Sequence, residues 1–104
     1  MQSNMKQTQQ LLAELRIQVE PILKEGAEHF EMMMPQCPSQ GHRAIRLLEC
    51  IDAMGSSVDM KTRHHWWRNA SVLRDFLSVR RTVLLLENKE KRKACAEMGI
   101  PILY

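Results

Sequence analysis

Apolar residues recur every three or four positions along most of the chain, which is the spacing of one face of an α-helix. The first stripe of this kind consists of Leu12, Leu15, Val19 and Ile22. Pro21 lies inside the stripe, and an interior proline kinks or ends a helix because it lacks the backbone N–H. The pattern therefore predicts a first helix over about residues 4–24, kinked or broken at Pro21.

Residues 26–41 interrupt this pattern and form the longest expected connection. Their end, PQCPSQG, contains two prolines and a glycine, which are strong breakers of regular structure. Phe30 and the three methionines that follow either close one end of the core or form an adaptable contact surface. Beyond this connection the apolar spacing predicts a helix from about Ser39 to Met54, with Gly55 as its left-handed stop.

The second half of the chain is also helical in pattern. Caps at Ser56 or Ser57 and at Asn69 predict helices over about 58–67 and 69–77. Because Trp66 and Trp67 are adjacent and diverge by about 100° on a helix, we expect one in the core and the other half-exposed.

The boundary near Ser78 is the least determined by the pattern. No glycine or proline lies between residues 77 and 79, so one helix over 69–98 fits as well as two. Since the mean helix has about 11–12 residues, we expect a corner at Ser78 and a last helix over 80–98, stopped by Gly99. The fold class that follows is all-α, a compact bundle of about five helices.

Composition is consistent with this architecture. The 104 residues are 44% apolar and 26% charged, as in ordinary globular chains. No run approaches the ~18 apolar residues of a membrane span. We expect a single helical domain over residues 1–104, with its core in about 8–98 and a long loop at about 26–41. Three cysteines without CxxC spacing favour a reducing, intracellular compartment.

Motifs for catalysis, metal binding or phosphate binding do not stand out. His64 and His65 are adjacent, so on a helix they diverge and cannot both face one ion. The four glycines are scattered singly, which excludes a glycine-rich phosphate loop. The sequence also lacks a nucleophile elbow of the hydrolase type. We therefore expect no enzyme, no metal and no other cofactor.

Positive charge gathers in the second half of the chain. Residues 1–60 carry a net charge of −3 and residues 61–104 carry +6. Basic residues beside two tryptophans are typical of nucleic-acid surfaces, although a solvated helical face is the simpler interpretation. A small basic nucleic-acid-binding regulator, helix-turn-helix-like over about 39–81, is therefore one hypothesis.

Residues 44–88 resemble the small helical domain shared by the N-terminus of transcription elongation factor S-II and the integrase-binding domain of lens epithelium-derived growth factor. The passages that carry the resemblance are IRLLECIDAM (45–54), VDMKTR (58–63), NASVLRDF (69–76) and VRRTVLLLEN (79–88). In addition, LLAELRIQVEPIL (11–23) can serve as the first helix of such a domain.

The resemblance implies a nuclear, non-enzymatic adaptor that binds short acidic motifs with an aromatic anchor in disordered transcription or chromatin proteins. Its relatives contact such motifs through two loops at one end of the bundle, which correspond here to 34–41 and 77–81. The partner-binding residues that we expect are Met34, Cys37, Leu77, Val79, Arg74, Arg80 and Arg81. The arginines would raise the encounter rate with an acidic peptide. We expect the chain to be a monomer, with an oligomer built on the Met and Trp surface as a further alternative.

Overall fold

Every regular element in the described part of the chain is an α-helix. The computed structural model describes residues 4–32, 39–55 and 58–99. Its helices are α1 (Asn4–His29), α2 (Gln40–Asp52) and α3 (Met60–Met98). The all-α class is confirmed, whereas the count of about five helices is wrong, because these ranges contain three.

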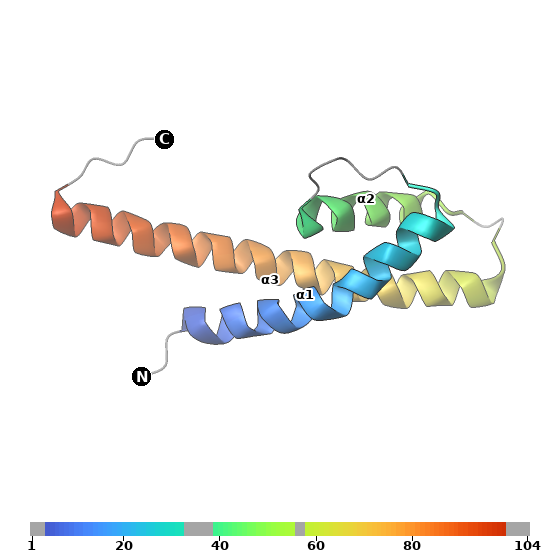
Figure 1. Ribbon diagram of the computed structural model, residues 1–104, viewed down its shortest axis with the longest axis horizontal. Helices are drawn as coiled ribbons and strands as arrows, with labels where there is room; N and C mark the ends of the chain where they lie inside the picture. Colours follow the sequence, from blue (N-terminus) through green and yellow to red (C-terminus); the bar gives the residue numbers. More distant parts are fainter. Residues whose placement is uncertain (1–3, 33–38, 56–57, 100–104) are drawn as a thin grey trace.

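The long helix α3 is the spine of the molecule (Figure 1). Both α1 and α2 lie against it and run in the opposite direction, and the end of α3 projects beyond the start of α1. A helix of 39 residues is about 58 Å long, and the longest dimension of the molecule is 58 Å. Its radius of gyration of 17.5 Å exceeds the roughly 13 Å of a compact domain of this length, so the bundle is elongated and not compact.

The unbroken course of α3 corrects two of the predicted boundaries. Asn69 does not cap a new helix, because its amide lies 3.2 Å from the ring of His65 on the preceding turn. Ser78 does not form a corner, and its carbonyl accepts a hydrogen bond from the Thr82 hydroxyl within the same helix. Residues 60–98 contain neither Gly nor Pro, so no residue of this segment interrupts the continuous series of helical backbone hydrogen bonds.

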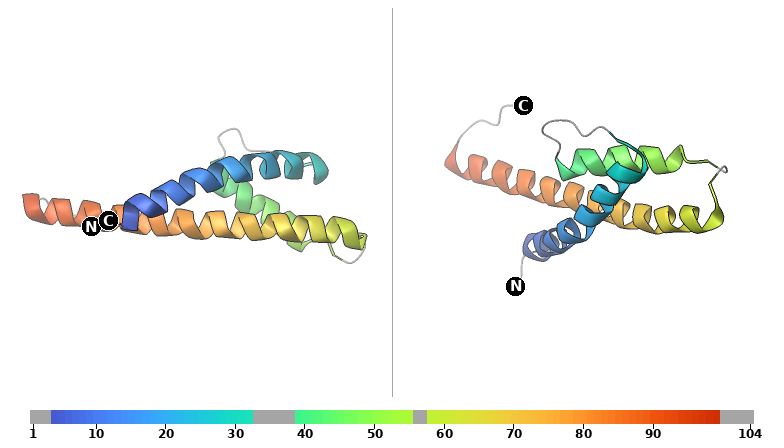
Figure 2. Two further views of the ribbon diagram at one scale, coloured as in Figure 1. Left: turned by 90° about the horizontal axis from the view of Figure 1, so that it is seen from below. Right: turned by 45° about the vertical axis from the view of Figure 1, so that its right-hand side comes forward.

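Helix α1 is longer than predicted. It continues through Pro21 to His29, and Figure 2 shows the helix bending about midway along its length. Pro21 is exposed, so its ring meets solvent and the missing N–H leaves no buried carbonyl without a partner. The connection to α2 therefore begins after residue 29, several residues later than the expected 26.

Side-chain caps begin α2 and α3, and a glycine ends α3. Ser39 caps α2 by accepting a hydrogen bond from the His42 N–H. Asp59 caps α3 through the Thr62 N–H and hydroxyl, where Ser56 or Ser57 was expected; these two serines lie outside the described residues. Gly99 is the predicted stop of α3 and caps it in the left-handed conformation, with φ of 70°. Gly55 is also left-handed, with φ of 69°, but it is not the stop of α2, because this helix ends at Asp52 with Ala53 as its C-cap.

All three helices contribute to one hydrophobic core. Its buried members are Leu12, Leu15, Val19, Leu23, Ala44, Leu47, Ile51, Trp66, Ala70, Leu73, Phe76 and Val83. Trp66 is 1% exposed and Trp67 is 50% exposed, which confirms their predicted division between core and surface. Phe30 and Met32 pack against this core, as expected if the connection closes one end of it. None of the helices in the described ranges is both long and apolar enough to cross a membrane.

Candidate protein-binding groove

Those predicted partner-binding residues that the structure describes lie on one helix and not on a loop. Met34 and Cys37 lie outside the described residues. The loop expected at 77–81 is absent, because α3 runs through it. Leu77 and Val79 are half-buried against the core. Because they are two positions apart on a helix, their side chains point about 200° apart. The loop geometry behind this prediction is therefore wrong, and the role of these residues as partner contacts stays a prediction.

The three arginines of the predicted site occupy different surroundings. Arg74 is exposed and lies 3.9 Å from Asp52 of α2. Arg81 is exposed, whereas Arg80 is half-buried and lies against Gly41 at the start of α2. Of these arginines, Arg80 is the one that lines hollows at the meeting point of the three helices.

An open groove between α1 and α3 begins beside the N-terminal end of α2. Because α2 has 13 residues, against 26 in α1 and 39 in α3, it covers only part of the face that α1 and α3 form together (Figure 1). On the side of the α2 N-terminus that faces away from α2, this face contains a hollow of about 360 Å³. The residues that line this groove are Gln9, Leu12, Ala13, Arg16, Arg80, Val83, Leu84 and Glu87.

The floor of the groove continues the core. Leu12 and Val83 are its deepest residues, 6% and 4% exposed, and Leu84 on the rim is 44% exposed. Along each helix the lining spans seven positions, which is about 10 Å or two helical turns. The face on which α2 packs therefore extends for two more turns, over which no third helix of the described residues lies.

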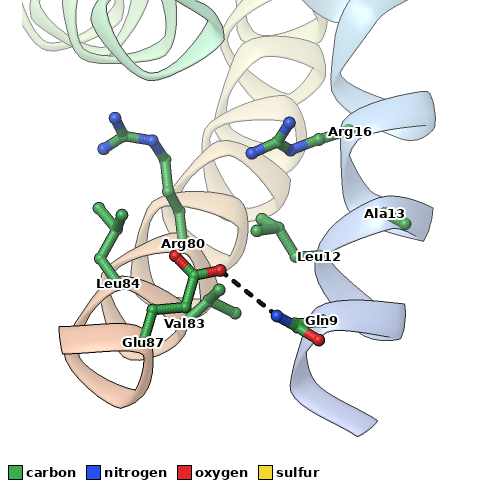
Figure 3. A pocket seen from close by; sticks show the side chains of 8 residues that line it. All are labelled: Gln9, Leu12, Ala13, Arg16, Arg80, Val83, Leu84 and Glu87. Carbon is green, nitrogen blue, oxygen red and sulfur yellow. Dashed lines mark hydrogen bonds between the residues drawn. The ribbon is translucent and has the colours of Figure 1, made fainter. Parts of the chain in front are cut away.

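Polar side chains stand at the two ends of the groove (Figure 3). Arg16 and Arg80 lie at the end nearer α2, where both also line a smaller hollow with Ser39, Gln40 and Gly41. At the other end Gln9 donates a hydrogen bond of 3.3 Å to Glu87. Neither guanidinium forms an ion pair with a carboxylate of the described residues, since the four ion pairs found there involve other groups.

A polar junction holds the start of α2 beside the groove. The Gln40 amide donates to the Glu20 carboxylate at 2.7 Å and to the Arg16 carbonyl at 3.2 Å. Arg43 forms an ion pair with Glu20 at 3.0 Å. The Nε of Arg43 is buried and has no hydrogen-bond partner in the described structure. These contacts fix where α2 begins, and the groove extends from this point away from α2.

This junction makes stability depend on pH through Glu20. The hydrogen bond from Gln40, followed by that from Arg43, holds the pKa of this carboxyl below its usual range. A lowered folded pKa stabilises the fold above the unfolded pKa of about 4.3, and the contribution is lost as pH falls through the folded value. Because Glu20 is 51% exposed, solvent screens the effect to about 1 kcal/mol or less.

We expect Glu20→Gln to lower the free energy of unfolding at pH 7 by up to about 1 kcal/mol. At a pH below the lowered pKa of Glu20, where both proteins lack the charge, the difference should shrink toward zero. Urea unfolding at the two pH values measures this change. An equal loss at both would show that the Glu20 charge does not contribute.

Titratable side chains at the opposite end of the molecule form a structural cluster. Trp66 packs between His29 and His65, with ring centroids 5.2 and 5.0 Å away. The Nε2 of His65 lies 2.6 Å from the Glu25 carboxylate. Within the described residues, no three His, Cys, Asp or Glu side chains gather as a metal site would require. The geometry of this cluster accounts for packing of α1 on α3.

Most groove residues escaped the sequence-based prediction, which named only Arg80 among them. The groove exists because α2 is shorter than its neighbours, and a difference in helix length becomes visible only when the helices are aligned in space. One signal was present in the sequence: the stripe Leu73, Leu77 and Leu84 continues past the positions that α2 covers.

No family model, no curated protein and no solved structure matches this chain. The resemblance to the elongation-factor and integrase-binding domains therefore stays a prediction that no comparison tests.

Proposed function

We propose that this chain is a non-enzymatic protein-interaction module that binds a helical segment of a partner in the groove between α1 and α3. The observation that supports this most directly is that the apolar face buried by α2 continues for two turns beyond it. An amphipathic helix laid into such a groove buries its apolar residues at positions i, i+3 or i+4, and i+7. The helix α2 presents Ala44, Leu47 and Ile51 to the same face in this way.

The partner segment in this proposal is a short stretch of a disordered protein that becomes helical on binding. Transcription and chromatin proteins are the class that the sequence resemblance implies. Ordering such a segment costs entropy, so we expect micromolar affinity. This is the same class of function as the adaptor predicted from the sequence, with the contact surface on the helix pair instead of on two loops.

The neighbours Leu84 and Leu85 offer a matched test of the groove. Leu84 lines it, whereas Leu85 is 61% exposed and does not line it. Binders are first selected from a displayed library of helical peptides of about eight residues, about two turns and so matched to the length of the groove. Leu84→Glu should then lower their affinity at least about tenfold, because it removes apolar burial of about 1.5–3 kcal/mol. Leu85→Glu should change it less than about twofold.

Circular dichroism of both variants provides the control for folding. Since both leucines are substantially exposed, each variant should retain the helicity of the parent chain. Equal effects of the two substitutions, or a library that yields no binder, would contradict the proposal.

A second candidate function is binding of duplex nucleic acid by an exposed stripe of residues on α3. Trp67, Arg74, Arg81 and Arg92 recur every seven or eleven residues on this helix, and all four are exposed, which suits contact with phosphates. A gel shift of duplex DNA that disappears as salt is raised, and that Leu84→Glu leaves unchanged, would favour this candidate over the groove.

A further inference from the structure

The groove carries opposite charges at its two ends. At the end nearer α2 stand the guanidinium groups of Arg16 and Arg80, and at the other end stands the Glu87 carboxylate (Figure 3). These three are the charged groups among its lining residues. Arg16 comes from α1 and Arg80 from α3, so the two guanidiniums flank the apolar floor from opposite walls. A carboxylate on the bound partner would contact Arg16 or Arg80 without displacing an ion pair of the described residues.

We infer that the groove takes an acidic amphipathic helix in one direction, with carboxylates in its last turn between Arg16 and Arg80. This inference rests on the proposed function and adds the partner's charge and polarity. A carboxylate between two guanidiniums forms charge-assisted hydrogen bonds, which are stronger than neutral ones. The last turn of any helix also carries partial negative charge, and its first turn carries partial positive charge.

Both ends of the groove select the same direction. A helix whose C-terminal end lies between Arg16 and Arg80 places its positive N-terminal end beside Glu87. It then runs parallel to α1 and antiparallel to α3, as α2 does (Figure 1). In the opposite direction, its N-terminal end would face two guanidiniums and its C-terminal end would face a carboxylate. Both contacts would be repulsive.

The test uses the same displayed library, with charged residues varied independently at both ends of each peptide. Among peptides selected on the parent chain, Asp and Glu should be concentrated in the last turn. The double variant Arg16→Glu with Arg80→Glu should lower their affinity about tenfold or more. Arg81→Glu is the matched control, because Arg81 is adjacent and exposed but does not line the groove; it should change affinity less than about threefold.

A nitroxide label at the C-terminus of a selected peptide measures direction independently. It should broaden the amide signals of Gly41 and Arg80 more than those of Gln9 and Glu87. The reversed pattern would overturn the inferred direction. Should the double variant fail to fold by circular dichroism, Arg16→Gln with Arg80→Gln replaces it, with the same direction of effect expected.

The outcomes separate this inference from the function on which it rests. Two results would overturn the inference and leave the groove as the binding site. In the first, the selected peptides are sensitive to Leu84→Glu but have no acidic last turn. In the second, peptides sensitive to Leu84→Glu bind Arg81→Glu and the double variant equally. Peptides insensitive to Leu84→Glu, or no binder at all, would overturn both.

Discussion

Trp66→Ala should lower the free energy of unfolding by about 3–5 kcal/mol, which is the usual cost of truncating a buried tryptophan. Trp66 is 1% exposed and lies within 5.2 Å, between ring centroids, of His29, Phe30 and His65. Domains of this size are stable by about 5–15 kcal/mol. The substitution therefore removes a large part of the total, and urea unfolding followed by circular dichroism should show it directly.

The adjacent Trp67 provides the control. Its side chain is 50% exposed and contacts the ring of His64 on the same helix. Trp67→Ala should therefore cost about 1 kcal/mol or less, within the range of surface substitutions. Equal losses for the two variants would show that the core does not centre on Trp66.

Gly26→Val should destabilise the fold by about 3 kcal/mol, at the upper end of the cost of overpacking a core. Glycine normally weakens a helix by about 1 kcal/mol relative to alanine, so on propensity alone a side chain at Gly26 would be favourable. A Cβ at this position, however, would lie 2.4 and 2.6 Å from the two methyl carbons of Leu47. Since Leu47 is fully buried, it has no room to move away.

A double-mutant cycle with Leu47→Ala tests this explanation. Removing the two methyl carbons should make Gly26→Val less damaging, with a coupling of about 0.5–3 kcal/mol. Gly41→Val is the matched control, because the nearest atoms there belong to the mobile end of the half-buried Arg80 side chain; it should cost about 1 kcal/mol or less. Additive effects of the changes at Gly26 and Leu47 would rule out the close contact as the cause.

Local signals in the sequence predicted the start of α2 and the end of α3 well. Ser39 and Gly99 act through hydrogen bonds to backbone groups within a few residues, so their effect can be deduced without knowing the tertiary structure. The division of the two tryptophans between core and surface was predictable for a similar reason, because it follows from helix geometry alone.

The continuity of α3 and the passage of α1 through Pro21 were not predictable in this way. Mean helix length favoured a corner at Ser78, but α3 packs against its partners on both sides of this residue, from Trp66 to Val83, and a helix gains most of its stability from such tertiary contacts. Pro21 is tolerated because it lies on the exposed side of α1. The groove exists because α3 is continuous, α1 passes through Pro21 and α2 is short. It could therefore be located only once the three helices were placed in space.

The antiparallel pairing of α1 with the far half of α3 also determines how the chain folds. Gln9 contacts Glu87, 78 residues later, so the core cannot close until most of the chain has been synthesised. Closing so long a loop carries an entropic cost before any contact offsets it. Folding should therefore be slower than in bundles whose helices pack in sequence order, because the rate falls as contacting residues lie farther apart along the chain. During synthesis α1 and α2 leave the ribosome with their apolar faces uncovered, and α3 is the segment that buries them.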